Sequence, residues 1–203
     1  MAAAPTAVVW DIGNVIVRWN PRTLYSKIFS DTAELDAFLE GVCTMDWNTE
    51  FDRGVSMTEG VDSLSLRYPH YAAQIAAWRD RWPEMLSGTI PESVAAIEAL
   101  AARGLPQFGL SNMARESQPV ILAMDPAFQY LDPLIFSADI GLIKPDVAIF
   151  EAALERFKRP ASELLFIDDS AANIDTARRL GFHVHRFEDP AAIEPLLRSH
   201  GLL

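Results

Sequence analysis

The strongest constraint on the fold is an alternation, after Pro91, of short apolar runs with stretches that carry apolar residues at helical spacing. The expected helices cover residues 92–103, 146–157 and 173–180, and the expected strands cover residues 107–110, 135–137, 164–167 and 183–187. Short strands that alternate with amphipathic helices are typical of parallel strands joined by right-handed crossovers. The sequence therefore predicts an α/β fold with a doubly wound parallel sheet.

One more strand is expected near the N-terminus. Ala7–Trp10 is a short apolar run that ends at Asp11, which is typical of a strand buried on both faces of a sheet. Gly13 and Asn14 interrupt this pattern, and apolar residues resume at Val15–Val17 before a polar turn. We therefore expect Ala7–Trp10 to be the first strand of the parallel sheet.

The stretch from residue 18 to residue 88 has a different character. Apolar residues recur there at helical spacing, at Leu35, Phe38, Leu39, Val42, Ile75, Trp78, Trp82 and Met85. No strand pattern is visible in this stretch, so we expect a small helical insertion. The predicted organisation is a core of residues 1–17 and 89–203 with a helical cap of residues 18–88. Trp78 and Trp82 are expected in the interior of that cap.

The charge and the cysteine content narrow the range of partners and compartments. A formal charge of −11 repels phosphate backbones and anionic lipids, so neither nucleic acid nor a membrane is expected as a partner. Cys43 is the single cysteine, so no internal disulfide is possible. The sequence shows neither a signal peptide nor an apolar run of the ~18 residues that a membrane span needs. A cytoplasmic protein is expected.

Polar residues follow the expected strands at the edge where ligands bind. In a doubly wound sheet that edge is formed by the carboxyl ends of the strands. The residues found there are Asp11, Ser111, Asn112, Asp168 and Asp169, and Lys144 follows its strand by a short loop. We therefore expect these side chains to meet in one site.

These residue types suit phosphoryl transfer. Carboxylates as close as Asp11, Asp168 and Asp169 would raise one another's pKa unless a cation neutralises them, and Mg²⁺ is a hard cation that prefers oxygen ligands. Lys144 supplies a positive charge, and Ser111 with nearby backbone N–H groups supplies hydrogen-bond donors. In-line attack by Asp11 on a phosphoryl group would form an aspartyl-phosphate that water then hydrolyses.

Four segments of the chain resemble the motifs of the haloacid dehalogenase-like hydrolases. In chain order these segments are Val8–Val15, Phe108–Asn112, Gly141–Asp146 and Leu165–Asn173. The helical insertion lies between the first and the second, which is the position of the C1-type cap in that superfamily. The four segments come in the family's order and span nearly the whole chain, so the resemblance is specific.

The resemblance implies a role for each of these positions. Asp11 would be the nucleophile and a metal ligand, and the backbone carbonyl of Gly13 would also meet the metal. Ser111 would bind the phosphoryl oxygens with Asn112 close by, and Lys144 would pair with both nucleophile and substrate. Asp168 and Asp169 would hold Mg²⁺, at least one of them directly. Asn173 would orient the loop that carries them.

The first motif departs from the pattern of most phosphatases in this superfamily. They carry Asp-x-Asp, and the second Asp transfers the proton; this chain has Gly13 there. Loss of a positioned acid or base lowers a rate by about 10²–10⁴-fold. The pattern Asp-x-Gly-Asn-Val resembles a branch of bacterial sugar-phosphate phosphatases that includes an α-glucose-1-phosphate phosphatase. The cap could instead lend an acid; the candidates are Asp46, Glu50, Asp52 and His70.

Three functions are compatible with these residues. The favoured one is a Mg²⁺-dependent phosphatase acting on a small phosphorylated metabolite. A 2-haloacid dehalogenase, in which Asp11 displaces halide from carbon, needs no metal, and those enzymes lack the Asp168–Asp169 pair. A non-catalytic binding or regulatory protein is the third alternative. The expected substrate-binding residues are Asn14, Trp47, Asp52, Arg53 and Asn112.

Overall fold

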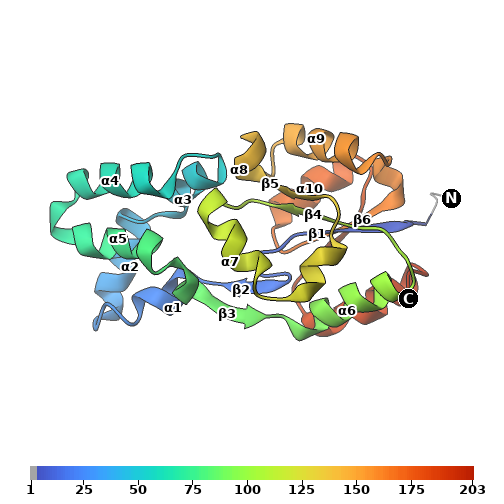
Figure 1. The fold of residues 1–203 in the computed structure, drawn as a ribbon, viewed down its shortest axis with the longest axis horizontal. Helices are drawn as coiled ribbons and strands as arrows, with labels where there is room; N and C mark the ends of the chain where they lie inside the picture. Colours follow the sequence, from blue (N-terminus) through green and yellow to red (C-terminus); the bar gives the residue numbers. More distant parts are fainter. Residues whose placement is uncertain (1–3) are drawn as a thin grey trace.

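A five-stranded parallel sheet forms the larger part of the computed structural model, which describes residues 4–203 (Figure 1). The strand order is β5-β4-β1-β6-β7, and every neighbouring pair is parallel. The strands are β1 (Ala7–Trp10), β4 (Gln107–Ser111), β5 (Leu134–Phe136), β6 (Leu164–Asp168) and β7 (His183–Arg186). The predicted α/β fold with a doubly wound parallel sheet is confirmed, and the predicted strand bounds lie within two residues of these.

Helices cover both faces of this sheet. Because successive side chains of a strand point to opposite faces, Ala7 and Val9 pack in one hydrophobic cluster while Val8 and Trp10 pack in the other. The first cluster is completed by α9 (Val147–Phe157) and α10 (Ala171–Arg179), and the second by α6 (Pro91–Ala102) and α11 (Ile193–Ser199). All four residues of β1 are fully buried, as a central strand requires.

The order of the strands places a crevice at the end of β1. The chain moves outward from β1 to β4 and β5, and then crosses to β6 and β7 on the other side. Ligands bind in such sheets where the winding direction reverses, at the carboxyl ends of the strands. Those ends point towards the helical part of the molecule, whereas the start of β1 and the C-terminus lie at the opposite end (Figure 1).

The helical part lies between the first two motifs, and we call it the cap. It consists of α1 (Pro21–Tyr25), α2 (Thr32–Gly41), α3 (Met45–Asp52), α4 (Met57–Arg67) and α5 (Ala72–Asp80). Asp31, Thr44 and Ser56 begin three of these helices, and each side chain accepts a hydrogen bond from a backbone N–H of the first turn. Trp78 and Trp82 are buried in the interior, as expected.

The expectation that residues 18–88 contain no strand is wrong. β2 (Val17–Trp19) and β3 (Leu86–Thr89) form a two-stranded antiparallel sheet that connects the cap to the core (Figure 1). Both strands are short, and the Leu-Ser-Gly-Thr sequence of β3 has no apolar alternation. Their pairing depends on contacts between residues far apart in the sequence, which a local pattern does not reveal.

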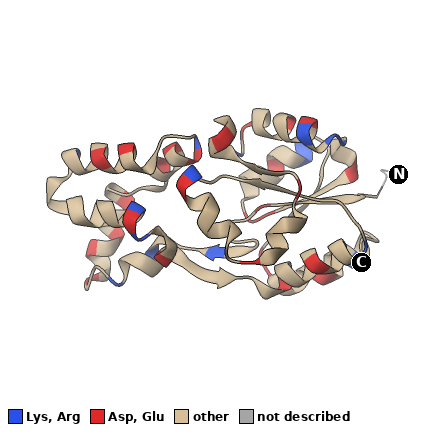
Figure 2. Ribbon diagram, in the orientation of Figure 1, with Lys and Arg blue, Asp and Glu red and all other residues tan. Residues whose placement is uncertain are grey.

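The remaining elements are short. They are the α-helices α7 (Gln118–Leu122) and α8 (Ser137–Ile140) and the 3₁₀ helices Pro69–Tyr71, Trp82–Met85, Arg115–Ser117, Pro126–Tyr130, Ala161–Glu163 and Pro190–Ala192. Among residues 4–203, no helix has the length and the apolar character needed to cross a membrane. Asp and Glu residues occur along helices of both the core and the cap (Figure 2).

The packing of α4 against α3 predicts a size limit at Gly60. A Cβ at this position would lie 2.2 Å from Cε1 of Phe51, whose ring is fully buried. Overpacking costs about 1–3 kcal/mol, more than the ~1 kcal/mol that alanine gains over glycine in a helix. We expect Gly60→Ala to lower the melting temperature, by roughly 2–4 °C for each kcal/mol lost.

Gly41→Ala is the matched control, because Gly41 is also helical and nothing lies within 4 Å of the added carbon. Its melting temperature, measured by calorimetry, is expected to equal or exceed that of the wild type. A Gly60→Ala protein as stable as the Gly41→Ala protein would contradict this account of the packing.

Candidate active site

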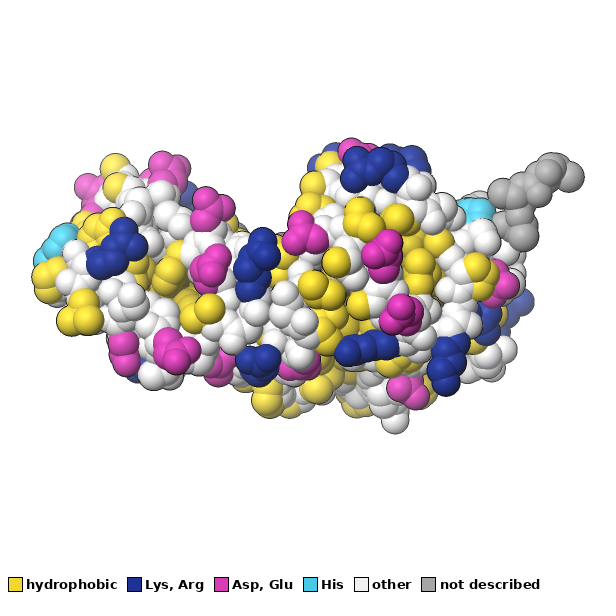
Figure 3. Space-filling view, turned by 90° about the horizontal axis from the view of Figure 1, so that it is seen from above, with side chains coloured by type: hydrophobic (Ala, Val, Ile, Leu, Met, Phe, Trp, Pro, Cys, Tyr) yellow, Lys and Arg dark blue, Asp and Glu magenta, His cyan; other side chains and the backbone are white. Residues whose placement is uncertain are grey.

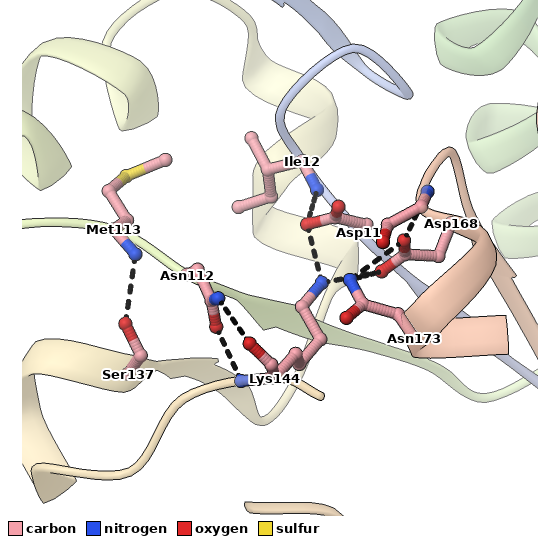
Figure 4. A network of polar contacts seen from close by, with 9 residues as sticks. Asp11, Ile12, Asn112, Met113, Ser137, Lys144, Asp168 and Asn173 are labelled. Atoms are coloured by element: carbon pink, nitrogen blue, oxygen red, sulfur yellow. Dashed lines mark hydrogen bonds and ion pairs between the residues drawn. The ribbon is translucent and has the colours of Figure 1, made fainter. Parts of the chain in front are cut away.

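Side chains from the ends of two neighbouring strands, β1 and β6, meet that of a loop lysine beyond the end of β1 (Figure 4). Asp11 follows β1 directly, Ser111 ends β4, Asp168 ends β6, and Lys144 comes from the loop between α8 and α9. Nζ of Lys144 lies 2.9 Å from Oδ1 of Asp11 and 2.7 Å from Oδ2 of Asp168. Lys144 is 3% exposed, Asp11 7% and Asp168 0%, so the ion pairs are shielded from water.

Negative charge dominates this site. Burial raises the pKa of Asp11 to about 7; Lys144 opposes that shift, whereas Asp168 and Asp169 add to it. Burial acts to lower the pKa of Lys144, but Asp11 and Asp168 outweigh it and the pKa is raised. The lysine is therefore charged at neutral pH, and one cation faces three carboxyl groups.

The three carboxyl groups suit a divalent cation. Asp11, Asp168 and Asp169 each offer an oxygen atom, and the three atoms lie within 4.8 Å of one another. Oxygen donors of this kind are what Mg²⁺ prefers, and a bound cation would offset the charge that Lys144 leaves unbalanced. Burial, followed by the charge of Asp168, also raises the pKa of Asp169. The residues present fit a magnesium ion.

Asp168 is the most firmly held of these carboxylates. Its Oδ1 accepts hydrogen bonds from the backbone N–H of Ser170 at 2.8 Å and from Nδ2 of Asn173 at 2.9 Å. Its Oδ2 accepts from Lys144 and, at 3.0 Å, from the same amide of Asn173. Asn173 lies in the first turn of α10, so that helix and β6 together hold the carboxylate in place.

Asn112 holds the backbone that carries Lys144. Its Nδ2 donates to the carbonyl oxygen of Lys144 at 2.9 Å, and its Oδ1 accepts from the backbone N–H of Lys144 at 2.8 Å. The backbone N–H of Ile12 donates to Oδ1 of Asp11 at 2.7 Å and so orients that carboxylate. Loop residues on both sides of the lysine–aspartate pair are thus held by hydrogen bonds.

A cavity of about 260 Å³ lies between the cap and the core, next to these residues. Its wall consists of Ile12, Gly13, Val17, Trp19, Met45, Asn48, Thr49, Asp52, Met57, Trp82, Asn112, Met113, Ala114, Ser117 and Ile121. The space-filling view shows the two parts as separate lobes with a notch between them (Figure 3). The mostly apolar wall, with a few polar groups, is typical of a small-molecule site.

The predicted substrate-binding residues fall into two groups. Asp52 and Asn112 line the cavity, but its wall, as residues 4–203 form it, includes none of Trp47, Arg53 and Asn14. The ring of Trp47 packs inside the cap, 5.3 Å from that of Trp78 between centroids, and Arg53 is exposed. The side chain of Asn14 forms a hydrogen bond that acts to lower the pKa of Asp169, so it belongs to the carboxylate cluster.

Two residues that the sequence analysis did not single out join the cap to the core. Oγ of Ser137 accepts from the backbone N–H of Met113 at 2.9 Å and donates to the carbonyl oxygen of Asp52 at 2.7 Å. Arg115 donates to the carbonyl oxygen of Gly54 at 3.0 Å. Ser137 and Arg115 each begin a short helix, and a single polar residue at such a position carries no periodic signal, so the sequence did not reveal this contact.

This fold and this site define a doubly wound α/β protein with a buried carboxylate–lysine pair at its strand ends. The family model of haloacid dehalogenase-like hydrolases matches residues 5–181, and the chain belongs to that family. The resemblance of the four motifs is thereby confirmed.

Two curated relatives illustrate the similarity. The chain is 31% identical to acyl-CoA dehydrogenase family member 10 of Mus musculus, over 91% of this chain and 16% of that protein. It is 22% identical to sesquiterpene phosphatase astK of Aspergillus oryzae, over 86% of both chains. The chain spans about a third or less of the first two curated relatives it matches, 32% of one and 16% of the other.

Solved structures share the fold. A haloacid dehalogenase family enzyme of Bacteroides thetaiotaomicron, in complex with magnesium and inorganic phosphate, superposes with a TM-score of 0.70 at 20% identity, over 91% of this chain and 94% of that one. The L-2-haloacid dehalogenase of Xanthobacter autotrophicus, with chloropropionic acid covalently bound, superposes with a TM-score of 0.64 at 17% identity, over 98% of this chain and 84% of that one. At these identities the likeness concerns the fold alone.

The buried ion pairs predict that Lys144→Met destabilises the protein in a pH-dependent way. The change leaves Asp11 and Asp168 buried without their cation, which costs about 3–5 kcal/mol. A carboxyl group whose pKa is raised in the folded state favours folding at low pH, and that contribution is lost as the pH rises through the raised pKa. We therefore expect a larger loss of melting temperature at pH 8 than at pH 5, measured in EDTA.

Lys27→Met is the control, because Lys27 pairs with Glu84 on the surface, where both side chains are largely exposed. Such pairs contribute about 0–1 kcal/mol, so little change is expected at either pH. Equal losses for the two lysine variants would show that the Lys144 pairs do not support the fold.

Proposed function

We propose that this protein is a Mg²⁺-dependent phosphatase that hydrolyses a small phosphorylated metabolite through an aspartyl-phosphate on Asp11. The observation that carries the proposal is the 2.9 Å contact between buried Lys144 and Asp11, next to two further carboxylates. A lysine there suits both a carboxylate nucleophile and a phosphoryl group, since each is negatively charged. The phosphatase among the relatives supports the same reaction class.

The residues divide the first half of the reaction among them. Lys144 and the N–H of Ile12 hold Oδ1 of Asp11, and Oδ2 attacks phosphorus opposite the leaving group. Lys144 and Ser111 bind the phosphoryl oxygens. When bound by the three carboxylates, Mg²⁺ supplies the positive charge that keeps Asp11 ionised and offsets the charge of the phosphoryl group. The phosphorus–oxygen bond to the alcohol breaks, and the aspartyl-phosphate forms.

Water completes the cycle. Its attack on phosphorus releases inorganic phosphate and regenerates the carboxylate of Asp11. The alcohol that leaves in the first half needs a proton, and the water that attacks in the second half must lose one. Gly13 can neither give nor accept a proton, so another group has to perform both transfers.

The cavity favours an apolar leaving group. Most of its wall is apolar; these residues are Ile12, Val17, Trp19, Met45, Met57, Trp82, Met113, Ala114 and Ile121. The polar side chains of the wall are those of Asn48, Thr49, Asp52, Asn112 and Ser117. Each sugar hydroxyl group that faced the larger apolar part instead would lack a partner, at a cost in binding free energy. We therefore assign the phosphate ester of a small, largely apolar alcohol as the substrate class, and the sesquiterpene phosphatase among the relatives is consistent with it.

A 2-haloacid dehalogenase is the second candidate. Halide leaves without a proton, so Gly13 would be no handicap, and a dehalogenase shares the fold. Against it stands the carboxylate cluster, because burying Asp168 and Asp169 beside a nucleophile that needs no metal carries an electrostatic cost. The third candidate, a non-catalytic binding protein, rests on the missing acid alone.

One assay separates the three candidates. Purified protein is given p-nitrophenyl phosphate or 2-chloropropionate, each with Mg²⁺ or with EDTA, and phosphate and chloride are measured. We expect phosphate release that requires Mg²⁺ and falls to background in Asp11→Asn, because the amide is not a nucleophile. Asp175→Asn, an exposed position on α10, is expected to keep wild-type activity.

The other outcomes are equally informative. EDTA-resistant chloride release would replace the phosphatase by the dehalogenase. Absence of turnover of both substrates and of a panel of alkyl and sugar phosphates would favour a non-catalytic binding protein. Substantial phosphate release by Asp11→Asn would refute the assignment of the nucleophile.

The substrate class predicts how kcat/KM depends on chain length. Each methylene group buried contributes about 0.8 kcal/mol, which corresponds to about fourfold in kcat/KM. We expect a rise from ethyl to butyl to hexyl phosphate, and a higher value for hexyl phosphate than for glucose 6-phosphate, which is also a primary alkyl ester. A flat series, or a preference for the sugar phosphate, would exclude an apolar leaving group.

A further inference from the structure

The open side of Gly13 shows where a proton donor is missing. Gly13 lies in the wall of the cavity, and a Cβ added there would have nothing within 4 Å. The space that a second carboxylate of the first motif would occupy is therefore free. An alkoxide is a poor leaving group, so a phosphatase with this cavity needs an acid at another point of its wall.

Only one of the four acid candidates in the cap reaches this cavity. Asp46, Glu50 and His70 are all exposed, and none of them lies in its wall. Among the described residues that form the wall, Asp52 alone has a titratable side chain. It comes from the last turn of α3 and shares the cavity wall with Gly13, which belongs to the core.

Asp52 is held in place at both its side chain and its backbone. Oδ2 accepts a hydrogen bond from Nδ2 of Asn48 at 3.2 Å, and Asn48 is itself buried in the cavity wall. The carbonyl oxygen of Asp52 accepts from Oγ of Ser137 at 2.7 Å. The carboxyl group is thus oriented from its own helix, and the backbone that carries it is tied to the core, which favours the fixed geometry that proton transfer needs.

The surroundings favour the protonated form of Asp52. Burial raises its pKa to about 7, and Lys144 is the charged group that opposes the shift. Because the group stays protonated up to about neutral pH, it can give a proton at the pH at which Asp11 must be ionised. Burial raises the pKa of Asp11 to about 7 as well, and a cation held by the carboxylate cluster would lower the pKa of Asp11 and so separate it from that of Asp52.

We propose that Asp52 of the cap performs the two proton transfers that the first motif, with Gly13 in place of an acidic residue, cannot perform. The inference rests on the proposed phosphatase function. As the phosphorus–oxygen bond breaks, its electron pair stays on the leaving oxygen, which takes the proton of Asp52. In the second half, the carboxylate of Asp52 removes a proton from water while the new phosphorus–oxygen bond forms. Asp52 ends protonated, and protons balance over the cycle.

Leaving groups of different acidity test this assignment in Asp52→Asn. p-Nitrophenol leaves without a proton, so we expect the first turnover of p-nitrophenyl phosphate to remain within tenfold of the wild type. The second half lacks its base, so a burst of about one nitrophenolate per active site should precede slow turnover. With hexyl phosphate even the first turnover should slow, by about 10²–10⁴-fold. The retained burst shows that the variant is folded.

Two further variants sharpen the test. Asp46→Asn, an exposed position on the same helix, is expected to behave as the wild type with both substrates. Adding Gly13→Asp to Asp52→Asn places a carboxyl group in the open space beside residue 13. The double variant should turn over hexyl phosphate at least tenfold faster than Asp52→Asn alone.

The two proposals fail in different ways. If the wild type hydrolyses p-nitrophenyl phosphate with Mg²⁺ but Asp52→Asn slows the first turnover of both substrates equally, Asp52 is not the acid and the phosphatase assignment stands. Unchanged turnover of hexyl phosphate by Asp52→Asn would likewise exclude Asp52 as the acid and leave the phosphatase assignment intact. Absence of Mg²⁺-dependent phosphate release from the wild type would overturn both.

Discussion

The contact of one buried lysine with two aspartates organises the site and the strands that carry it. Lys144 lies between Asp11 at the end of β1 and Asp168 at the end of β6. Removed from water, these charges are stable only while they are paired, so the lysine fixes where the two strand ends lie. Because one cation faces three carboxyl groups, the pairing is incomplete, and this deficit makes the place suitable for a metal ion and a phosphoryl group.

The core and the cap contribute different parts of the chemistry. In the proposed reaction, the core supplies the nucleophile and the metal-binding carboxylates at the ends of its strands, and the lysine from a loop. The cap supplies much of the apolar wall of the cavity and, through α3, a carboxyl group whose pKa is raised to about 7. The hydrogen bond between Ser137 and the backbone of Asp52 ties the two parts together. In the proposed mechanism, the element that selects the leaving group also protonates it.

Most of the core could be predicted because its signals are local. A short apolar run such as Ala7–Trp10 indicates a buried strand whatever the rest of the chain, and β1 has the bounds that the sequence predicted. The pairing of β2 with β3 was missed because neither strand has a pattern of its own. Trp47 was expected at the substrate, but its ring packs within the cap, since the direction of an aromatic side chain depends on its neighbours in space.

The sequence by itself determined the fold class and the polar residues at the strand ends, because parallel strands bring their carboxyl ends to one edge and the residues that follow them must meet there. It also showed that Gly13 cannot transfer a proton. Only the tertiary structure decided which of the cap's acid candidates lines the cavity. The sequence offered Asp46, Glu50, Asp52 and His70 as acids and placed Asp52 alone among the expected substrate-binding residues. In the structure α3 brings Asp52 to the cavity, whereas the other three are exposed.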